Sequence, residues 1–283
     1  MAVKIDGSKG ITLPTLSVNP SLPTTGDLMY FNGEGIKYYN GTDFVGLDRA
    51  DGTSYAKAVD RSTDIPQGYP TGWYWVKFNG TPRQVWVDMD YDGGGWVLVA
   101  SHTSGYGIAN ATYSETTNIG DYICKNAFTI GTGNPTQNTV LLPLPMWPLI
   151  SQANGNSPYN VVTHVYSANG VGPSTATYRS RWTFTGWTSQ FGWQGASNLA
   201  NEVGGVTPNV YSSHVVPGYP WTTYDNDQDT YSSNCAQQYG NQPFWYESCW
   251  SGNWFAGGSG YSNAWYWTGS GSDYHAYGAA YVK

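Results

Sequence analysis

Three aspartates occupy alternate positions in the segment PWTTYDNDQDTYSSNCA, which spans residues 220–236. The spacing of Asp225, Asp227 and Asp229 places carboxylate oxygens within reach of one hard cation, and such oxygens are the ligands that Ca²⁺ prefers. The segment is not an EF-hand loop, because Thr230 and Ala236 stand where that loop needs Gly and Glu. The spacing therefore predicts a calcium loop, and the alternative is an acidic turn whose carboxylates are only solvated.

The last third of the chain concentrates aromatic side chains among a few polar ones. Flat aromatic faces stack on the apolar face of a sugar ring, and polar rims orient it, so this region is a candidate glycan-binding surface. The candidate residues are Tyr246, Trp250, Trp254, Asn263, Trp265, Trp267 and His275. The alternative is that some of these rings belong to the core, as we expect for Trp245. A single His such as His275 is more often a hydrogen-bonded surface residue than a ligand.

The sequence contains no recognisable catalytic motif. It lacks the G-x-S-x-G elbow of serine hydrolases and the H-E-x-x-H of zinc peptidases. Cys124 has no His close to it in the sequence, although a partner distant in the chain stays open. We therefore expect a binding protein rather than an enzyme. A glycosidase with paired carboxylates is the alternative, because a sequence does not give the separation that this chemistry requires.

The composition excludes several classes of partner. The net charge is −7 with only 12 Lys and Arg, which provides no electrostatic footprint for nucleic acid or anionic lipid. No apolar run is long enough to span a bilayer, and the first residues, MAVKIDGSKGITLP, lack the apolar core of a secretory signal. The excess of 14 Trp and 24 Tyr over 8 Phe indicates surfaces that are partly exposed to water, because Trp and Tyr combine a large apolar ring with a polar group. Three cysteines predict one disulfide and one free thiol.

The pattern along the chain predicts an α+β protein in three parts. Residues 1–47 are expected to form a small β segment, because Asn32-Gly33 and Asn40-Gly41 are hairpin signals between short aromatic runs. So small a segment has too little core to stand alone, so we expect it to dock and trimerise. The alternative is an ordered arm packed on the main domain. Residues 48–64 are polar and predict a linker.

Residues 65–283 are expected to form one domain with short strands, few helices and long irregular loops. Alternation with period two predicts strands over 72–78, 83–89, 96–101, 161–167 and 178–184. Helices are expected over 146–153 and around 196–203. The three glycines at 93–95 allow the backbone to turn and to approach a neighbour closely.

The stretch VWVDMDYDGGGWVLVAS (85–101), with GWYWVKFNGTPRQV before it, resembles the opening of the fibrinogen-like C-terminal domain. Intelectins share the Gly-Gly-Gly-Trp element. The segment 220–236 is similar to the calcium loop of fibrinogen-like domains, which implies carboxylate ligation by Asp227 and Asp229. Backbone carbonyls of Tyr231 and Ser233 would complete the set. A Cys is usual in the family where Trp86 stands, so the family's first disulfide is missing.

The same resemblance implies a disulfide between Cys235 and Cys249 beside the calcium loop, which leaves Cys124 free. In related domains the residue after the second Cys helps to line a ligand pocket, and here that residue is Trp250. The final AAYVK resembles the closing strand of intelectin-like domains. The second calcium of intelectins is not expected, because only Asp273 and His275 offer comparable chemistry.

The stretch LPTTGDLMYFNGEGIKYYNGTDFVGL (22–47) resembles an element of bacteriophage tail fibre proteins. Joined to a fibrinogen-like domain, it implies a trimeric phage receptor-binding protein in the virion, which contacts tail or baseplate proteins through its N-terminus and recognises a bacterial surface glycan. Such proteins assemble in the bacterial cytoplasm and need no signal peptide. The alternatives are a secreted lectin of the same fold, a virion enzyme that trims polysaccharide, and a purely structural virion part.

Overall fold

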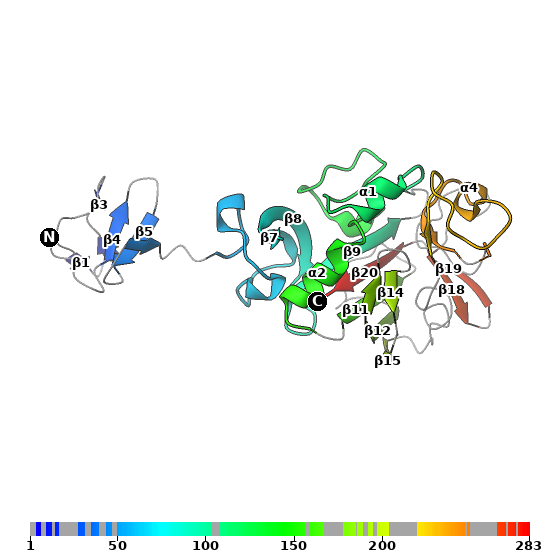
Figure 1. Ribbon diagram of the computed structural model, residues 1–283. Helices are drawn as coiled ribbons and strands as arrows, with labels where there is room; N and C mark the ends of the chain where they lie inside the picture. The colour runs from blue at the N-terminus through cyan, green and yellow to red at the C-terminus, as the bar shows by residue number, and fades with distance from the viewer. Residues whose placement is uncertain are drawn as a thin grey trace. The chain divides into compact units, whose positions relative to one another are not determined.

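The computed structural model describes backbone and side chains over residues 50–103, 108–156, 220–246, 248–249 and 278–283. In the other strands named below it describes the backbone, together with the side chains of residues 179, 181, 183 and 202. The chain divides into two compact units, Met1–Asp51 and Gly52–Lys283, and each is described by itself (Figure 1).

The N-terminal unit is built from short strands. β1 (Lys4–Asp6) and β2 (Gly10–Thr12) form an antiparallel pair. A second sheet has the order β3 (Thr15–Leu16), β4 (Leu28–Phe31), β5 (Gly35–Tyr39) and β6 (Phe44–Gly46), in which β3 runs parallel to β4 and the remaining pairs are antiparallel. The expected meander is therefore present as β4–β5–β6. The Asn-Gly turns themselves lie outside the described residues.

An antiparallel sheet organises the C-terminal unit. Its order is β15 (Ser197–Val203), β12 (Tyr178–Phe184), β11 (Tyr159–Tyr166), β20 (Tyr277–Val282), β9 (Trp96–Thr103), β8 (Thr81–Asp88) and β7 (Gly72–Phe78), with β10 (Val140–Leu141) also paired to β9. All five strands expected from alternation are present. The final strand β20 lies between β11 and β9 (Figure 1), so the sheet is completed only by the end of the sequence.

The remaining strands form short pairs: β13 (Gly186–Thr188) with β14 (Gly192–Gln194), β16 (Trp221–Thr222) with β17 (Phe244–Trp245), and β18 (Trp265–Gly269) with β19 (Gly271–His275). Single-turn 3₁₀ helices lie at Tyr55–Lys57, Ser62–Asp64 and Pro135–Gln137. Short strands and long connections agree with the expected α+β class.

The α-helices of the described chain are short: α1 (Tyr113–Thr117), α2 (Met146–Ala153) and α4 (Cys235–Gln238). The expected helix over 146–153 is confirmed. The helix expected around 196–203 is wrong, because this segment forms strand β15 and pairs with β12. In the described part of the chain, no helix has the length and apolar character of a membrane span.

The segment 52–64 is part of the C-terminal unit, so the expected linker over 48–64 is wrong for most of its length. Val59 donates its N–H to Trp75 O at 3.0 Å and accepts from Lys77 N at 2.8 Å, which covers the edge of β7. The side chains of Ala58, Val59 and Ile65 are buried in the core. Ala58 and Val59, with Ile65 directly after the segment, therefore anchor residues whose average composition is polar.

The glycines at 93–95 make the tight turn that connects β8 to β9. All three have φ between 71° and 81°, a region that favours glycine. A Cβ at Gly94 would lie 3.0 Å from Met89 O, and one at Gly95 would lie 3.0 Å from Thr63. The turn then leads directly into Trp96, a fully buried ring at the start of β9.

Candidate functional site

The predicted calcium loop leaves the core at a pair of tryptophans. Trp221 on β16 lies opposite Trp245 on β17, and their ring centroids are 4.6 Å apart. Trp245 also packs on Trp147, at 5.9 Å, and is 2% exposed, as expected for a core residue. This buried aromatic contact fixes the first residues of the loop.

The carboxylate of Asp225 accepts hydrogen bonds from its own loop and from α1. Its Oδ1 accepts a hydrogen bond from Thr223 Oγ1 at 2.7 Å and another from the backbone N–H of Tyr113 at 2.9 Å. Thr223 and Asn226 also exchange two backbone hydrogen bonds. One oxygen of Asp225 thus holds the local structure together, and the role of Asp225 as a metal ligand stays a prediction.

The carboxyl groups of Asp227 and Asp229 lie close together. Burial raises the pKa of Asp229, and the neighbouring Asp227 raises it further, while backbone N–H donors lower it. Those donors are Tyr231 N on Oδ1 and Cys235 N on Oδ2, each at 3.0 Å. Among the described residues neither carboxyl forms an ion pair with a Lys, Arg or His. Two adjacent carboxylates without a cationic side chain fit a bound Ca²⁺, which prefers such oxygens.

No group of three or more His, Cys, Asp and Glu side chains with metal-binding geometry occurs in the described part of the chain. The predicted ligand set differs from such a group, because it combines two carboxylates with two backbone carbonyls. The residues that would supply those carbonyls, Tyr231 and Ser233, are exposed at the surface of the loop. The calcium site therefore stays a prediction that the carboxyl pair supports.

The helix α4 closes the loop. Asn234 caps it by accepting from Gln237 N at 3.0 Å, and the Asn234 amide donates to Thr223 O at 2.9 Å. In the structure a disulfide joins Cys235 to Cys249, with the Cα atoms 4.9 Å apart. Cys124 is a half-buried free thiol. The loop is thus tied to its own first strand and to the segment that follows β17.

Of the residues expected to form a glycan surface, one is buried in the core and three lie outside the described residues. Tyr246 is 1% exposed, and its hydroxyl donates to Gln242 O at 3.1 Å. Its ring stacks on Tyr239, with centroids 6.0 Å apart, so the expectation that it faces a ligand is wrong. Trp250, Trp254 and Asn263 lie outside the described residues.

The predicted loop over 263–275 contains a hairpin of β18 and β19. Its register pairs Trp265 with His275 and Trp267 with Asp273. Residues directly opposite one another in an antiparallel pair share a face, as do residues two apart on one strand. The backbone therefore brings three of the predicted residues, Trp265, Trp267 and His275, to one face of this hairpin.

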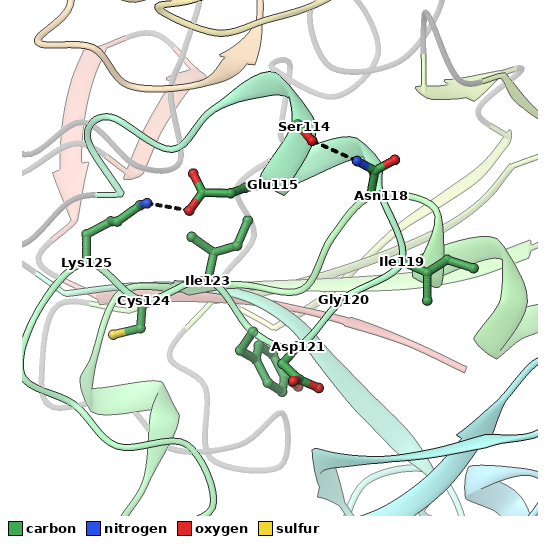
Figure 2. A pocket seen from close by; sticks show the side chains of 10 residues that line it. Ser114, Glu115, Asn118, Ile119, Gly120, Asp121, Ile123, Cys124 and Lys125 are labelled. Atoms are coloured by element: carbon green, nitrogen blue, oxygen red, sulfur yellow. Dashed lines mark hydrogen bonds and ion pairs between the residues drawn. The ribbon is translucent and has the colours of Figure 1, made fainter.

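A hollow that the sequence did not indicate lies between α1 and the segment 118–125 (Figure 2), with a volume of about 370 Å³. Figure 2 shows Glu115 and Lys125 facing one another across it, with Lys125 Nζ 2.7 Å from Glu115 Oε1. Asn118 Nδ2 donates to Ser114 Oγ at 2.8 Å. Burial acts to raise the pKa of Glu115, but the bonds from Lys125 and Thr112 outweigh it and lower the pKa.

The helix α1 has a different neighbour on each side. The Thr116 hydroxyl accepts from Trp221 Nε1 at 2.9 Å, and Tyr113 N binds Asp225. Ser114, Glu115 and Asn118 line the hollow. At 3.6 residues per turn these two sets fall on opposite faces. A capping box, in which Thr112 and Glu115 bond each other reciprocally, starts this helix, and the Thr-x-x-Glu spacing is a sequence signal that could have predicted it.

Comparisons with known proteins identify the C-terminal unit. The family model for the C-terminal globular domain of fibrinogen beta and gamma chains matches residues 65–274. The chain is similar to the fibrinogen-like globe domain of human ANGPTL2, with a TM-score of 0.51 and 21% identity, over 75% of this chain and 92% of that one. It is also similar to lamprey fibrin D-dimer complexed with the peptide Gly-His-Arg-Pro-amide, with a TM-score of 0.50 and 13% identity, over 79% and 72%. At these identities the likeness concerns the fold. Curated proteins yield no match.

Proposed function

Because the chain belongs to the family of the C-terminal globular domain of fibrinogen beta and gamma chains, we propose that it is a binding protein whose C-terminal unit recognises a glycan on a bacterial surface. The observation that carries this proposal is the loop around Asp227 and Asp229, which is held by α1, by α4 and by the disulfide. Loops fixed in this way lose less conformational entropy when a ligand binds.

The proposed ligand surface combines the calcium loop with the segments that follow it. Asp227 and Asp229 would hold Ca²⁺ through their carboxylates, and Tyr231 and Ser233 through their carbonyls. The ion would supply a fixed positive charge that keeps the two carboxylates together. Trp250, Trp254, Asn263, Trp265, Trp267 and His275 are the proposed contacts to the glycan.

The N-terminal unit supports the proposal that the chain is a phage tail fibre protein. It is a compact unit of its own, formed by Met1–Asp51, and its sequence resembles an element of tail fibre proteins. We assign to it the docking to other tail or baseplate proteins and the formation of a homotrimer. A trimer presents three weak glycan sites at once, which raises the overall affinity through avidity.

The experiment is binding of the full chain to arrayed bacterial glycans with calcium and with a chelator. The proposed function predicts calcium-dependent binding to a subset of glycans and its loss in Trp250→Ala with the melting temperature unchanged. Tyr246→Phe is the matched control, because it alters a buried aromatic residue of the same segment. A failure to bind any glycan would contradict the proposal. Release of new reducing ends from bound polysaccharide would identify an enzyme instead.

A further inference from the structure

We propose that the hollow between α1 and residues 118–125 binds one neutral sugar ring, as a glycan subsite in addition to the surface predicted around Trp250. This inference rests on the proposed function as a glycan-binding protein. It assigns a place and a ligand class to a site that lies on the face of α1 opposite the calcium loop.

The hollow presents hydrogen-bond donors and acceptors that the protein itself does not use fully. Lys125 Nζ carries three N–H groups, and Glu115 is its partner for one of them. Among the described residues, Asn118 Oδ1 and Asp121 Oδ2 accept no hydrogen bond, while Asp121 Oδ1 accepts from Arg83 at 2.8 Å. Each sugar hydroxyl both donates and accepts, so it can use both kinds of group.

The charges of the hollow balance, which favours a neutral ligand. Glu115 is paired with Lys125 and Asp121 with Arg83, so the two carboxylates face two cations. An anionic or cationic ligand would have to compete with one of these pairs. A polyhydroxyl ring binds beside them without separating any charge.

The size and the apolar part of the hollow also suit a sugar. Its volume of about 370 Å³ lies near the lower end of small-molecule sites. Ile119 on its rim is 42% exposed, and only Tyr55 and Tyr231 are comparably exposed large apolar residues in the described chain. The C–H face of a sugar ring can cover this side chain while its hydroxyl groups reach the polar residues.

The walls of the hollow are fixed before any ligand binds. The buried Thr116 and Tyr122 anchor its two sides, since Trp221 Nε1 bonds the Thr116 hydroxyl and the Tyr122 hydroxyl donates to Leu98 O. Ile123 exchanges two backbone hydrogen bonds with Leu141, at 2.8 and 3.0 Å. Such preorganisation favours binding by a shallow site, for which we expect a dissociation constant on the order of 1 mM.

The test is saturation-transfer NMR of the full chain with methyl glycosides of glucose, galactose, mannose and N-acetylglucosamine. Lys125→Met and Asn118→Ala should each lower the affinity for the bound sugar, by about tenfold for the charged donor. Lys77→Met is the matched control, because Lys77 is 36% exposed against 30% for Lys125 and also pairs with a carboxylate, that of Asp60. Its sugar signal should equal that of the wild type.

Cys124 provides a second measurement that needs no substitution. This half-buried thiol lines the hollow, so a bound sugar should slow its alkylation by iodoacetamide. Slower alkylation together with signal loss in the two hollow variants supports the proposal. If the wild type binds a sugar but neither the alkylation rate of Cys124 nor the affinity of the two variants changes, the subsite in the hollow is wrong while glycan recognition elsewhere still stands. A wild type that binds none of the four glycosides or any arrayed glycan contradicts the proposed function itself, and the hollow with it.

Discussion

The backbone N–H of Tyr113 donates a hydrogen bond of 2.9 Å to Oδ1 of Asp225, which lies 112 positions later in the chain. Tyr113 is the first residue of α1, and an N–H at that position has no partner within its helix. Because the same oxygen accepts from Thr223 Oγ1, one carboxylate both caps α1 and shapes the start of the calcium loop. The helix and the loop should therefore gain and lose order together.

Removal of this carboxylate should destabilise the domain, because α1 and the calcium loop lose the bond that joins them. Asp225→Ala leaves Tyr113 N without its acceptor, which costs about 1–2 kcal/mol, the size of a lost helix cap. Asp225→Asn keeps an oxygen at the same place and should cost less. Differential scanning calorimetry checks both, with and without a chelator. An Asp225→Ala protein as stable as the wild type would show that the bond carries no net stability.

Chelation should lower the melting temperature of the wild type, because Ca²⁺ binds the native state and stabilises it. The stabilisation is about 2.7 kcal/mol when the free ion is at 100 times its dissociation constant. Asp227→Asn combined with Asp229→Asn should abolish the response to a chelator. Asp60→Asn serves as the control for a lost aspartate charge outside the loop and should keep the response. A double variant that still responds would place the calcium elsewhere.

Strands of the main sheet were predictable because side chains that alternate in character with period two over six or more residues fit a β-strand and not a helix. GWYWVKF forms β7 over its predicted bounds, and the burial of β7 alternates as the sequence does. The segment 197–203 was not predictable, because SNLANEV has helix-forming residues and no alternation. Pairing with β12 overrides that local preference. Such pairing depends on a strand distant in the chain.

The candidate site was predictable only where residue types and spacing specify chemistry. The carboxylates of Asp227 and Asp229 lie together, as the alternate spacing predicts. The excess of Trp was interpreted as a half-wetted surface, yet Trp96, Trp147 and Trp221 are fully buried. Two of these indole N–H groups are satisfied inside the protein, since Trp147 Nε1 donates to Leu142 O at 2.7 Å and Trp221 Nε1 donates to Thr116 Oγ1, whereas Trp96 Nε1 has no hydrogen-bond partner in the described part of the chain. Composition does not distinguish a tryptophan satisfied inside the protein from one at its surface.

Peptide mapping without reductant should recover Cys235 and Cys249 joined and Cys124 as a free thiol. Cys235→Ser combined with Cys249→Ser should lower stability by about 3 kcal/mol, the chain-entropy value for a loop of this length. The structure gives the two residues a separation of 14 positions and buries both. Cys124→Ser is the control and should have a small effect. Recovery of both bonded residues as alkylated thiols would contradict the pairing.

The N-terminal unit should drive assembly. Its strands are two to five residues long, and so few short strands bury too little surface to be stable alone. Light scattering should give the mass of a trimer for the full chain and of a monomer for a chain beginning at Gly52, the first residue of the C-terminal unit. The same number of copies in both proteins would show that the C-terminal unit sets the oligomeric state.

Acid should destabilise the C-terminal unit through His102. This side chain on β9 is fully buried, and among the described residues neither ring nitrogen has a hydrogen-bond partner. Burial lowers its pKa from 6.5 to about 4, so between these values the unfolded chain binds a proton that the native state does not. The His102 contribution to the free energy of unfolding should therefore be fully present above pH 6.5 and fall by about 3 kcal/mol as the pH approaches 4.

The raised pKa values of Asp88 and Asp229 act in the opposite direction, because those carboxyl groups bind protons more readily when folded. Urea unfolding of the wild type and of His102→Leu across this range separates the two effects, since only the His102 contribution differs. The variant should lose less stability on acidification, and parallel pH profiles would show that His102 does not titrate with unfolding.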